Sequence, residues 1–203
     1  MVNLAIGPLA LFVLVSSITP GPNNLLLLRS GAAFGVRRSL GHLAGVQLGF
    51  AGLVVLSHLG VGALLLALPG AFLVLRWACF GYLMYLAWLI LRDSKPAPAV
   101  TAAPAVTSRP MRLVEAVLFQ FVNPKAWMMT ITIATAFYGN AAPRAVDLAA
   151  AVAVSLPIGA VCMLVWTAWG ASIHAVLRTP RAMRIYSIAM ALTVALTAVW
   201  MLR

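Results

Sequence analysis

Hydrophobic residues fill long stretches of this chain, and polar residues gather in the short segments between them. Six stretches are long enough for a helix to cross a hydrocarbon core, which needs roughly 20 apolar residues. The pattern therefore predicts an all-α integral membrane protein with six transmembrane helices. We expect these helices near residues 4–28, 40–66, 70–91, 114–138, 147–170 and 184–202.

Polar patches containing proline interrupt two of the stretches, one in each half of the chain. The first is TPGPNN at 19–24 and the second is QFVNPK at 120–125. A proline frees backbone groups that lipid cannot satisfy, so such a break is tolerated only where it faces protein or a water-filled cavity. Matched breaks in two halves point to the binding site of a secondary transporter built from a structural repeat. We therefore predict that the first and fourth helices are broken and that the breaks form the substrate site.

A segment rich in Pro, Ala, Ser and Thr at 92–112 is the clearest linker, and it predicts an extended, largely disordered connector. It separates a first three-helix repeat, residues 1–91, from a second, residues 113–203. Because each half holds an odd number of spans, the two repeats must be inverted relative to each other in the membrane. The halves share no convincing residue-by-residue identity, so this expectation rests on span count, length and the paired breaks.

The composition indicates that lipid surrounds much of the protein, and the distribution of basic residues predicts how the protein is oriented in the membrane. Of the 203 residues 64% are hydrophobic and 8% charged, with a mean hydropathy of +1.04, whereas soluble domains are roughly 45–50% apolar and about 25% charged. The net charge of +11 suggests nucleic acid, but ten basic residues lie in the loops after the first, third and fifth stretches and only two on the opposite side. This positive-inside asymmetry places those loops in the cytoplasm and both termini in the periplasm, and it indicates no nucleic-acid partner. The ten are Arg29, Arg37, Arg38, Arg92, Lys95, Arg109, Arg112, Arg178, Arg181 and Arg184, and the two are Arg144 and Arg203.

Lys125 is the sharpest candidate for chemistry, because a lysine within a membrane span is costly and is a functional hypothesis by default. Charged, it could bind a substrate carboxylate; buried without a partner, it could exchange a proton during transport. The alternative is that its long stem carries the ammonium to the cytoplasmic interface. Arg76 lies near the outer end of its span and suits the interface better.

The acidic residues favour a neutral substrate. Asp93, Glu115 and Asp147 are the only acids, and each lies near a predicted membrane boundary. A pocket for a dibasic substrate would need a carboxylate, whereas a zwitterionic amino acid would not. Its ammonium could meet side-chain carbonyls and helix C-terminal carbonyls, and its carboxylate a helix N-terminus after either break. The side chains we expect for the ammonium are those of Asn23, Asn24 and Asn123.

The second stretch carries small residues along one face and one polar side chain. Small residues spaced by four let helices approach closely, and tight packing is the simplest interpretation of these glycines. Gln47 is a candidate pathway residue or, alternatively, makes a structural hydrogen bond between helices. The glycines are Gly41, Gly45, Gly49 and Gly52.

Four motifs together resemble the LysE/RhtB family of bacterial inner-membrane amino-acid exporters. They are TPGPNN (19–24), HLAGVQLGF (42–50), RWACFGYLMYLAW (76–88) and FQFVNPKAW (119–127), and the resemblance covers nearly the whole chain. It implies a six-span efflux protein that exports amino acids or close derivatives and is driven by the proton gradient. The family's broken-helix motifs fall here on Pro20, Gly21, Pro22, Asn23, Asn123, Pro124 and Lys125.

The motifs look most similar to the cysteine/O-acetylserine branch, with homoserine and threonine exporters also close. Family members that export basic amino acids tend to carry an acid in the second span, where this chain has Phe50. The resemblance therefore implies a neutral substrate, and it leaves the oligomeric state open, a homo-oligomer included.

Two other classes of protein remain as alternatives. A membrane thiol-disulfide electron carrier needs two nearby cysteines, and Cys79 and Cys162 lie in neither broken stretch. A membrane scaffold would not explain polar residues at helix breaks. No H-E-x-x-H, G-x-S-x-G or Walker-type motif occurs, so we expect neither an enzyme nor a cofactor or metal site.

Overall fold

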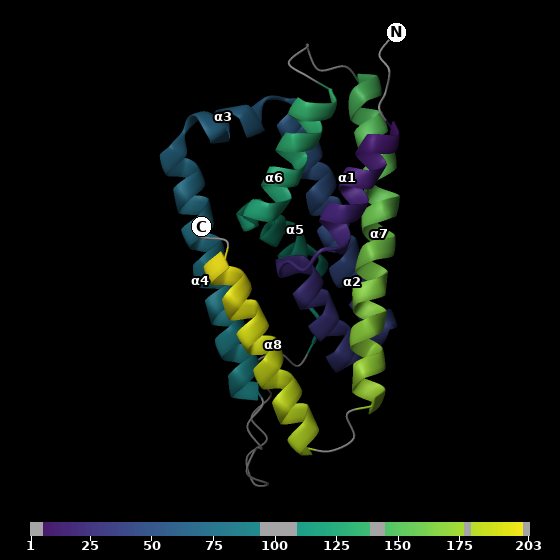
Figure 1. Ribbon diagram of the computed structural model, residues 1–203, viewed down its shortest axis with the longest axis vertical. Coiled ribbons are helices and arrows are strands. Elements are labelled where there is room, and N and C mark those ends of the chain that lie inside the picture. Colours follow the sequence, from purple (N-terminus) through teal and green to yellow (C-terminus); the bar gives the residue numbers. More distant parts are fainter. Residues whose placement is uncertain (1–5, 94–108, 139–144, 177–179, 201–203) are drawn as a thin grey trace.

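Helices account for almost all of the computed structural model, which describes residues 6–93, 109–138, 145–176 and 180–200 (Figure 1). Within these ranges there is no strand. Residues 94–108, which make up most of the predicted linker, lie outside the described part. The helices are α1 (Ile6–Ile18), α2 (Pro22–His58), α3 (Val61–Ala67), α4 (Pro69–Asp93), α5 (Leu113–Val122), α6 (Pro124–Thr132), the short π-helical η1 (Ile133–Phe137), α7 (Ala145–Val176) and α8 (Pro180–Trp200).

The apolar character of these helices confirms a membrane protein. Three segments among the described residues are long and apolar enough to cross a bilayer, and three shorter helical segments are also apolar. Large apolar side chains cover the outside of the protein, with Val74 69% and Leu196 68% exposed. Soluble monomers rarely expose apolar surface on this scale, so lipid covers these faces. The long segments are Pro22–His58, Leu73–Arg92 and Ala145–Ile173, and the shorter ones are Ile6–Ile18, Leu113–Val122 and Arg184–Trp200.

Both predicted breaks are present in the backbone. Helix α1 ends at Ile18 and α2 begins at Pro22, while α5 ends at Val122 and α6 begins at Pro124. In each case proline stands at the first helical position, where its missing N–H leaves no hydrogen bond unmade. The prolines thus start new helices and do not kink continuous ones.

Helix α2 contains a reversal that the sequence did not predict as such. Its one non-helical residue is Gly35, with φ 76° and ψ 167°, a positive φ that suits glycine. Ser30 and Ser39 flank it, and their hydroxyl oxygens lie 2.7 Å apart, although nine residues of straight helix would separate them by about 13 Å. The chain therefore doubles back at Gly35, and a single residue replaces the loop expected between the first two spans.

The second predicted span ends earlier than expected. We predicted a helix to residue 66, but α2 ends at His58 because Gly60 takes a left-handed conformation with φ 88°. Its backbone N–H then bonds to the carbonyl of Ser57 at 3.2 Å, which closes the last turn. The short α3 follows and crosses the upper end of the molecule towards α4 (Figure 1).

Close contacts at glycines hold the central helices together. Added Cβ atoms at Gly31 of α2 and Gly170 of α7 would collide with the carbonyl oxygens of Thr167 and Leu28, respectively. On the returning half of α2, a Cβ at Gly45 would collide with the backbone of α5 at Leu113. The predicted tight packing is confirmed at Gly45 and Gly49, whereas nothing lies within 4 Å of a Cβ at Gly41 and only an ordinary contact at Gly52.

These contacts predict opposite effects for two chemically identical substitutions. Gly45→Ala would push a methyl group against α5, where the Ala116 Cβ is 2.7 Å from the new atom. We expect it to lower the free energy of unfolding by about 1–3 kcal/mol. Gly41→Ala is the matched control, and it should be neutral or stabilising because alanine favours helices. Thermal unfolding of both variants in detergent checks this, and equal stabilities would contradict the packing described.

Candidate functional site

The C-terminal end of α1 has carbonyl groups that no further helical turn can satisfy, and other helices supply their partners. The Nδ2 of Asn24 in α2 donates to the carbonyls of Ser17 at 2.7 Å and Thr19 at 2.9 Å. The indole N–H of Trp166 in α7 donates to the carbonyl of Ile18 at 3.1 Å. The first break is therefore held by side chains, as backbone within a membrane requires.

Lys125 of α6 completes this arrangement across the two halves of the chain. Its Nζ donates to the carbonyl and the Oγ1 of Thr19, at 3.1 and 3.0 Å, and to the carbonyl of Pro20 at 3.2 Å. These three bonds use every N–H of the ammonium. A Cβ at Gly21 would lie 2.9 Å from both Cδ and Nζ of the lysine, so glycine leaves the room that this side chain needs. The ammonium thus lies at the first break.

The second break carries its own cap. Asn123 is 1% exposed, and its Oδ1 accepts from the backbone N–H of Lys125 at 3.1 Å. The Asn123 carbonyl accepts from the backbone N–H of Trp127 at 3.2 Å, and the Trp127 indole donates to the carbonyl of Phe121 at 3.0 Å. The N-terminus of α6 is therefore already occupied by a protein group.

The N-terminus of α2 differs in this respect. Its N-cap is Gly21, which has no side chain, and no side-chain cap is present there. The first-turn amides, including those of Asn23 and Asn24, have no partner within an α-helix. Since these amides form the positive end of the helix dipole, they suit an anionic group. Of the two helix N-termini expected from the sequence, only that of α2 is left uncapped by a side chain.

An amide pair joins the two breaks directly. Asn23 Nδ2 donates to Gln120 Oε1 at 2.9 Å, and Gln120 Nε2 donates back to Asn23 Oδ1 at 3.0 Å. Gln120 is completely buried. Gln120 is the first residue of the second polar patch, but its sequence context indicates no particular role. In the structure it is the hydrogen-bonding partner that fixes the side chain of Asn23.

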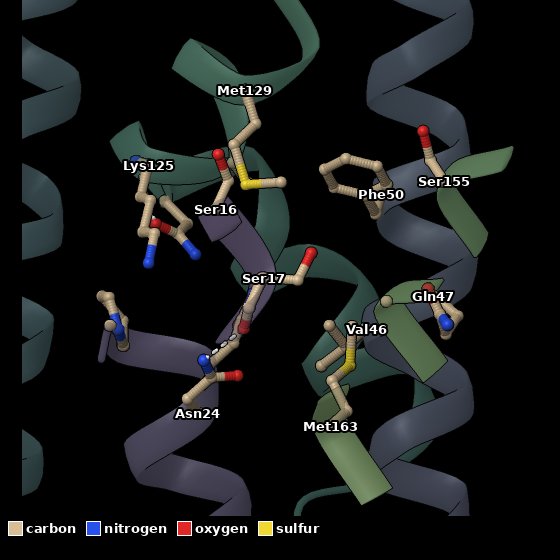
Figure 2. Close-up of a pocket in the computed structure, with 16 residues that line it drawn as sticks. Ser16, Ser17, Asn24, Val46, Gln47, Phe50, Lys125, Met129, Ser155 and Met163 are labelled. Carbon is tan, nitrogen blue, oxygen red and sulfur yellow. Dashed lines mark hydrogen bonds between the residues drawn. The ribbon is translucent and has the colours of Figure 1, made fainter. Parts of the chain in front are cut away.

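A cavity of about 50 Å³ lies where α1, α2, α6 and α7 meet at the breaks (Figure 2). Such a volume holds a few water molecules. Its polar groups come from amides, hydroxyls and the Lys125 ammonium, and none of the described residues around it is acidic. The lining residues are Ser16, Ser17, Gly21, Pro22, Asn23, Asn24, Val46, Gln47, Phe50, Asn123, Lys125, Ala126, Met129, Ser155, Gly159 and Met163.

Most of the site residues predicted from the sequence line this cavity. The two exceptions are prolines: Pro20 is exposed and contributes its carbonyl to Lys125, and Pro124 is buried at the start of α6. Gln47 lines the cavity and also donates to the carbonyl of Leu156 in α7 at 2.7 Å. The hydrogen bond between helices considered for Gln47 is therefore present, and its role in a substrate pathway stays a prediction.

Sequence reasoning missed the contribution of α7. Ser155 is 1% exposed, lines the cavity, and its hydroxyl has no hydrogen-bond partner among the described residues. A polar residue two positions before Pro157, with Gly159 just beyond, was an available signal. The flexible apolar side chains of Met129 and Met163 also line the cavity, and no comparable pattern in the sequence indicates them.

The two cysteines lie outside the cavity. Cys79 is on α4 and Cys162 on α7, and both are buried free thiols. Each packs as a small apolar residue, and neither lies at a helix break.

Broken helices that meet around a polar cavity in an apolar helical protein define the class of a membrane transporter. The family described as LysE type translocator matches residues 14–203, so the chain belongs to that family. This finding confirms the resemblance inferred from the four motifs.

Individual relatives agree with this assignment. The chain is 36% identical over 163 residues to a cysteine/O-acetylserine efflux protein of Klebsiella pneumoniae, covering 78% of each chain. It is 34% identical over 127 residues to the protein of that name in Escherichia coli K12, covering 62% of each. An uncharacterized membrane protein of Vibrio cholerae is 28% identical over 173 residues, 85% of this chain and 84% of that one. No solved structure matches the chain.

Proposed function

We propose that this protein is a secondary exporter of small neutral amino acids or their derivatives, of the cysteine/O-acetylserine or homoserine/threonine class. The proposal rests on one observation: the cavity between the two helix breaks combines an ammonium, amides and hydroxyls with no acidic residue among its described lining. Membership of the translocator family and the efflux relatives support it. Export would run across the bacterial inner membrane by proton antiport.

The polar groups of an amino acid have complementary partners in this cavity. Its carboxylate would lie between Lys125 Nζ and the uncapped first turn of α2. Its ammonium would face Asn24, which uses Nδ2 for the α1 carbonyls while its Oδ1 points away from them (Figure 2). Because Lys125 already makes three bonds to the end of α1, binding a carboxylate would exchange one or more of them. Substrate binding would thereby alter what holds α1.

The apolar part of the cavity favours a small neutral side chain. Val46, Phe50 and Met163 form this part, and Phe50 is 8% exposed. A second cation would lose its hydration here with no carboxylate to replace it, which disfavours lysine or arginine as substrates. The small volume of the cavity also favours a small substrate.

A groove on the outer side of the cavity suggests the exit route. It has a volume of about 270 Å³ and lies between α1 and α6. Ser16, Lys125 and Met129 line both the groove and the central cavity. A substrate bound at Lys125 would therefore leave between α1 and α6 once α1 moved.

The packing of the helices supports six spans arranged as two inverted repeats, residues 1–91 and 113–203, joined by a cytoplasmic linker. In this arrangement α1 with the first half of α2 corresponds to α5 with α6. The second half of α2 corresponds to α7, and α4 to α8. The contacts between the proposed repeats are then equivalent in pairs: α1 packs against α7, and α5 packs against the second half of α2 at Gly45 and Gly49.

The first prediction from this function concerns Lys125. Lys125→Met keeps most of the apolar stem and removes the charge, so we expect efflux to fall about 100-fold, since the carboxylate loses the one cationic partner among the described lining residues. Lys125→Arg keeps a charge with a different shape, and it should retain partial activity if the role is carboxylate binding. The measurement is efflux of labelled L-cysteine from proteoliposomes under an imposed pH gradient.

Loss of the α1 cap must be separated from loss of substrate binding. Thr19→Val is the matched control, because it removes one of the three acceptors of Lys125 Nζ but leaves the ammonium in place. It should retain most activity, and melting temperatures of all variants show which remain folded. Near-normal transport by folded Lys125→Met would remove the main support for the site.

The second prediction concerns substrate charge. Overexpression should protect cells against toxic levels or analogues of cysteine, serine, threonine or homoserine, and not against analogues of lysine or arginine. Phe50→Asp should lower export of the neutral substrates at least about tenfold, because it places an unpaired charge in the apolar part of the cavity. Phe50→Leu, the apolar control, should have a smaller effect. Protection limited to basic analogues would overturn this assignment.

The third prediction concerns orientation. Ten basic residues lie in the loops on one side of the membrane and two on the other, which predicts that both termini face the periplasm. A C-terminal alkaline phosphatase fusion should be active, and a C-terminal fluorescent-protein fusion dark. The reverse pattern would show that the groove between α1 and α6 opens to the cytoplasm instead.

A further inference from the structure

A second cavity, separate from the central one, lies at the end of the molecule that carries the basic loops. It has a volume of about 270 Å³ and lies between the parts of α2 on either side of Gly35, the C-terminal half of α4 and the start of α5. None of its lining residues belongs to the central cavity. If this end faces the cytoplasm, as proposed above, the cavity opens on the side from which an exported molecule must enter.

His42 is the unusual residue in this cavity. It is 2% exposed and lines the cavity, yet neither Nδ1 nor Nε2 has a hydrogen-bond partner among the described residues. Buried polar side chains are nearly always paired, because an unpaired one costs about 1–3 kcal/mol. An imidazole with two unpartnered nitrogens beside an open cavity can form hydrogen bonds to a ligand. It can also bind water that a ligand then displaces.

The charged groups around His42 favour an anionic group. The two guanidinium groups of Arg29 and Arg109 line the cavity together with one carboxylate, that of Glu115. That carboxylate is already occupied: it accepts two bonds from Arg109, at 2.6 and 2.9 Å, and one from the backbone N–H of Arg112 at 2.8 Å. With two guanidinium groups and one carboxylate, the described lining of this cavity carries a net positive charge. Tyr82 adds a hydroxyl-bearing ring to the same wall.

We propose that this cavity is an entrance site that binds the carboxylate of the outgoing amino acid before it reaches the central cavity, with His42 as a neutral hydrogen-bonding partner. The inference rests on the proposed export function. It assigns a second substrate site that neither the family match nor the broken-helix motifs indicate.

The geometry of α2 connects the two sites. Asn24 of the central cavity and Arg29 of the entrance cavity lie on the same helical segment, five residues apart. This spacing corresponds to about 7.5 Å along the helix axis. Five residues also turn by about 140° around the axis, so the two sites adjoin the same helical segment on different sides of it. A carboxylate would move along and around this segment to reach the uncapped helix N-terminus.

The test is a comparison of the two sides of the membrane. In inside-out vesicles the cytoplasmic face is exposed, and the KM for uptake of labelled L-cysteine should rise about tenfold in His42→Phe, since the ring remains but its nitrogens are lost. His42→Gln, which keeps a polar group, should rise less. The maximal rate of uptake into these inside-out vesicles should stay unchanged in both variants. In right-side-out vesicles, where the outer face is exposed, the KM should not change.

His58→Phe is the matched control, because His58 is also buried in α2 but lies at its other end, outside both cavities. It should leave the KM on both sides unchanged. Competition identifies the recognised group: 3-mercaptopropionate, which has a carboxylate and no amine, should compete at the cytoplasmic face, and cysteamine should not. Equal KM values for His42→Phe and His58→Phe, or an equal rise on both sides for His42→Phe, would overturn the entrance site.

A measurement on the unmodified protein covers the case in which His42→Phe fails to fold. With ¹⁵N-labelled histidine in nanodiscs, addition of O-acetyl-L-serine should shift the ring nitrogen signals of His42 and leave those of His58 in place. Unchanged His42 signals at saturating ligand would overturn the proposal. Failure of export itself is distinct, since the wild-type vesicles would then take up no cysteine on either side.

Discussion

The requirement that every backbone carbonyl find a partner away from water governs the centre of this molecule. A helix that stops within the bilayer exposes carbonyls that lipid cannot satisfy. Here α1 stops at Ile18, and Asn24, Trp166 and Lys125 bring donors from α2, α7 and α6 to its end. The same requirement therefore brings four helices together around one point. The central cavity is the space left at that point.

Glycine contacts and side-chain hydrogen bonds have different roles in this assembly. The contacts at Gly31, Gly45 and Gly170 bring backbones so close that no methyl group fits between them. Such contacts fix α2 against α7 and α5 and leave little freedom for sliding. By contrast, the end of α1 is held by polar side chains whose bonds can be exchanged for others. The contacts between α2, α5 and α7 and those at the end of α1 thus differ in physical nature.

Much of this site could be predicted from the sequence, because polar residues are rare in an apolar chain and stand out. The two breaks, Lys125 and the asparagines beside them were found in this way. Trp166 and Ser155 were not predicted, because a tryptophan or a single serine in an apolar helix occurs both at positions that face lipid and at positions that pack against another helix. The reversal at Gly35 was also missed, because the arginines that follow it indicated a loop. Partners distant in sequence, such as Gln120 for Asn23, become visible only once the chain is folded.

Polar and apolar contacts hold different parts of α1: side-chain hydrogen bonds hold its C-terminal end, while Leu9 and Val13 are buried in the apolar core. The end of α1 is held by six such hydrogen bonds, two from Asn24, one from Trp166 and three from Lys125. Each contributes about 1 kcal/mol net, because water or a substrate can take the place of either partner. In the proposed export function, exchanging these bonds for a substrate or water would release the C-terminal end of the 13-residue helix Ile6–Ile18 without breaking a helical turn.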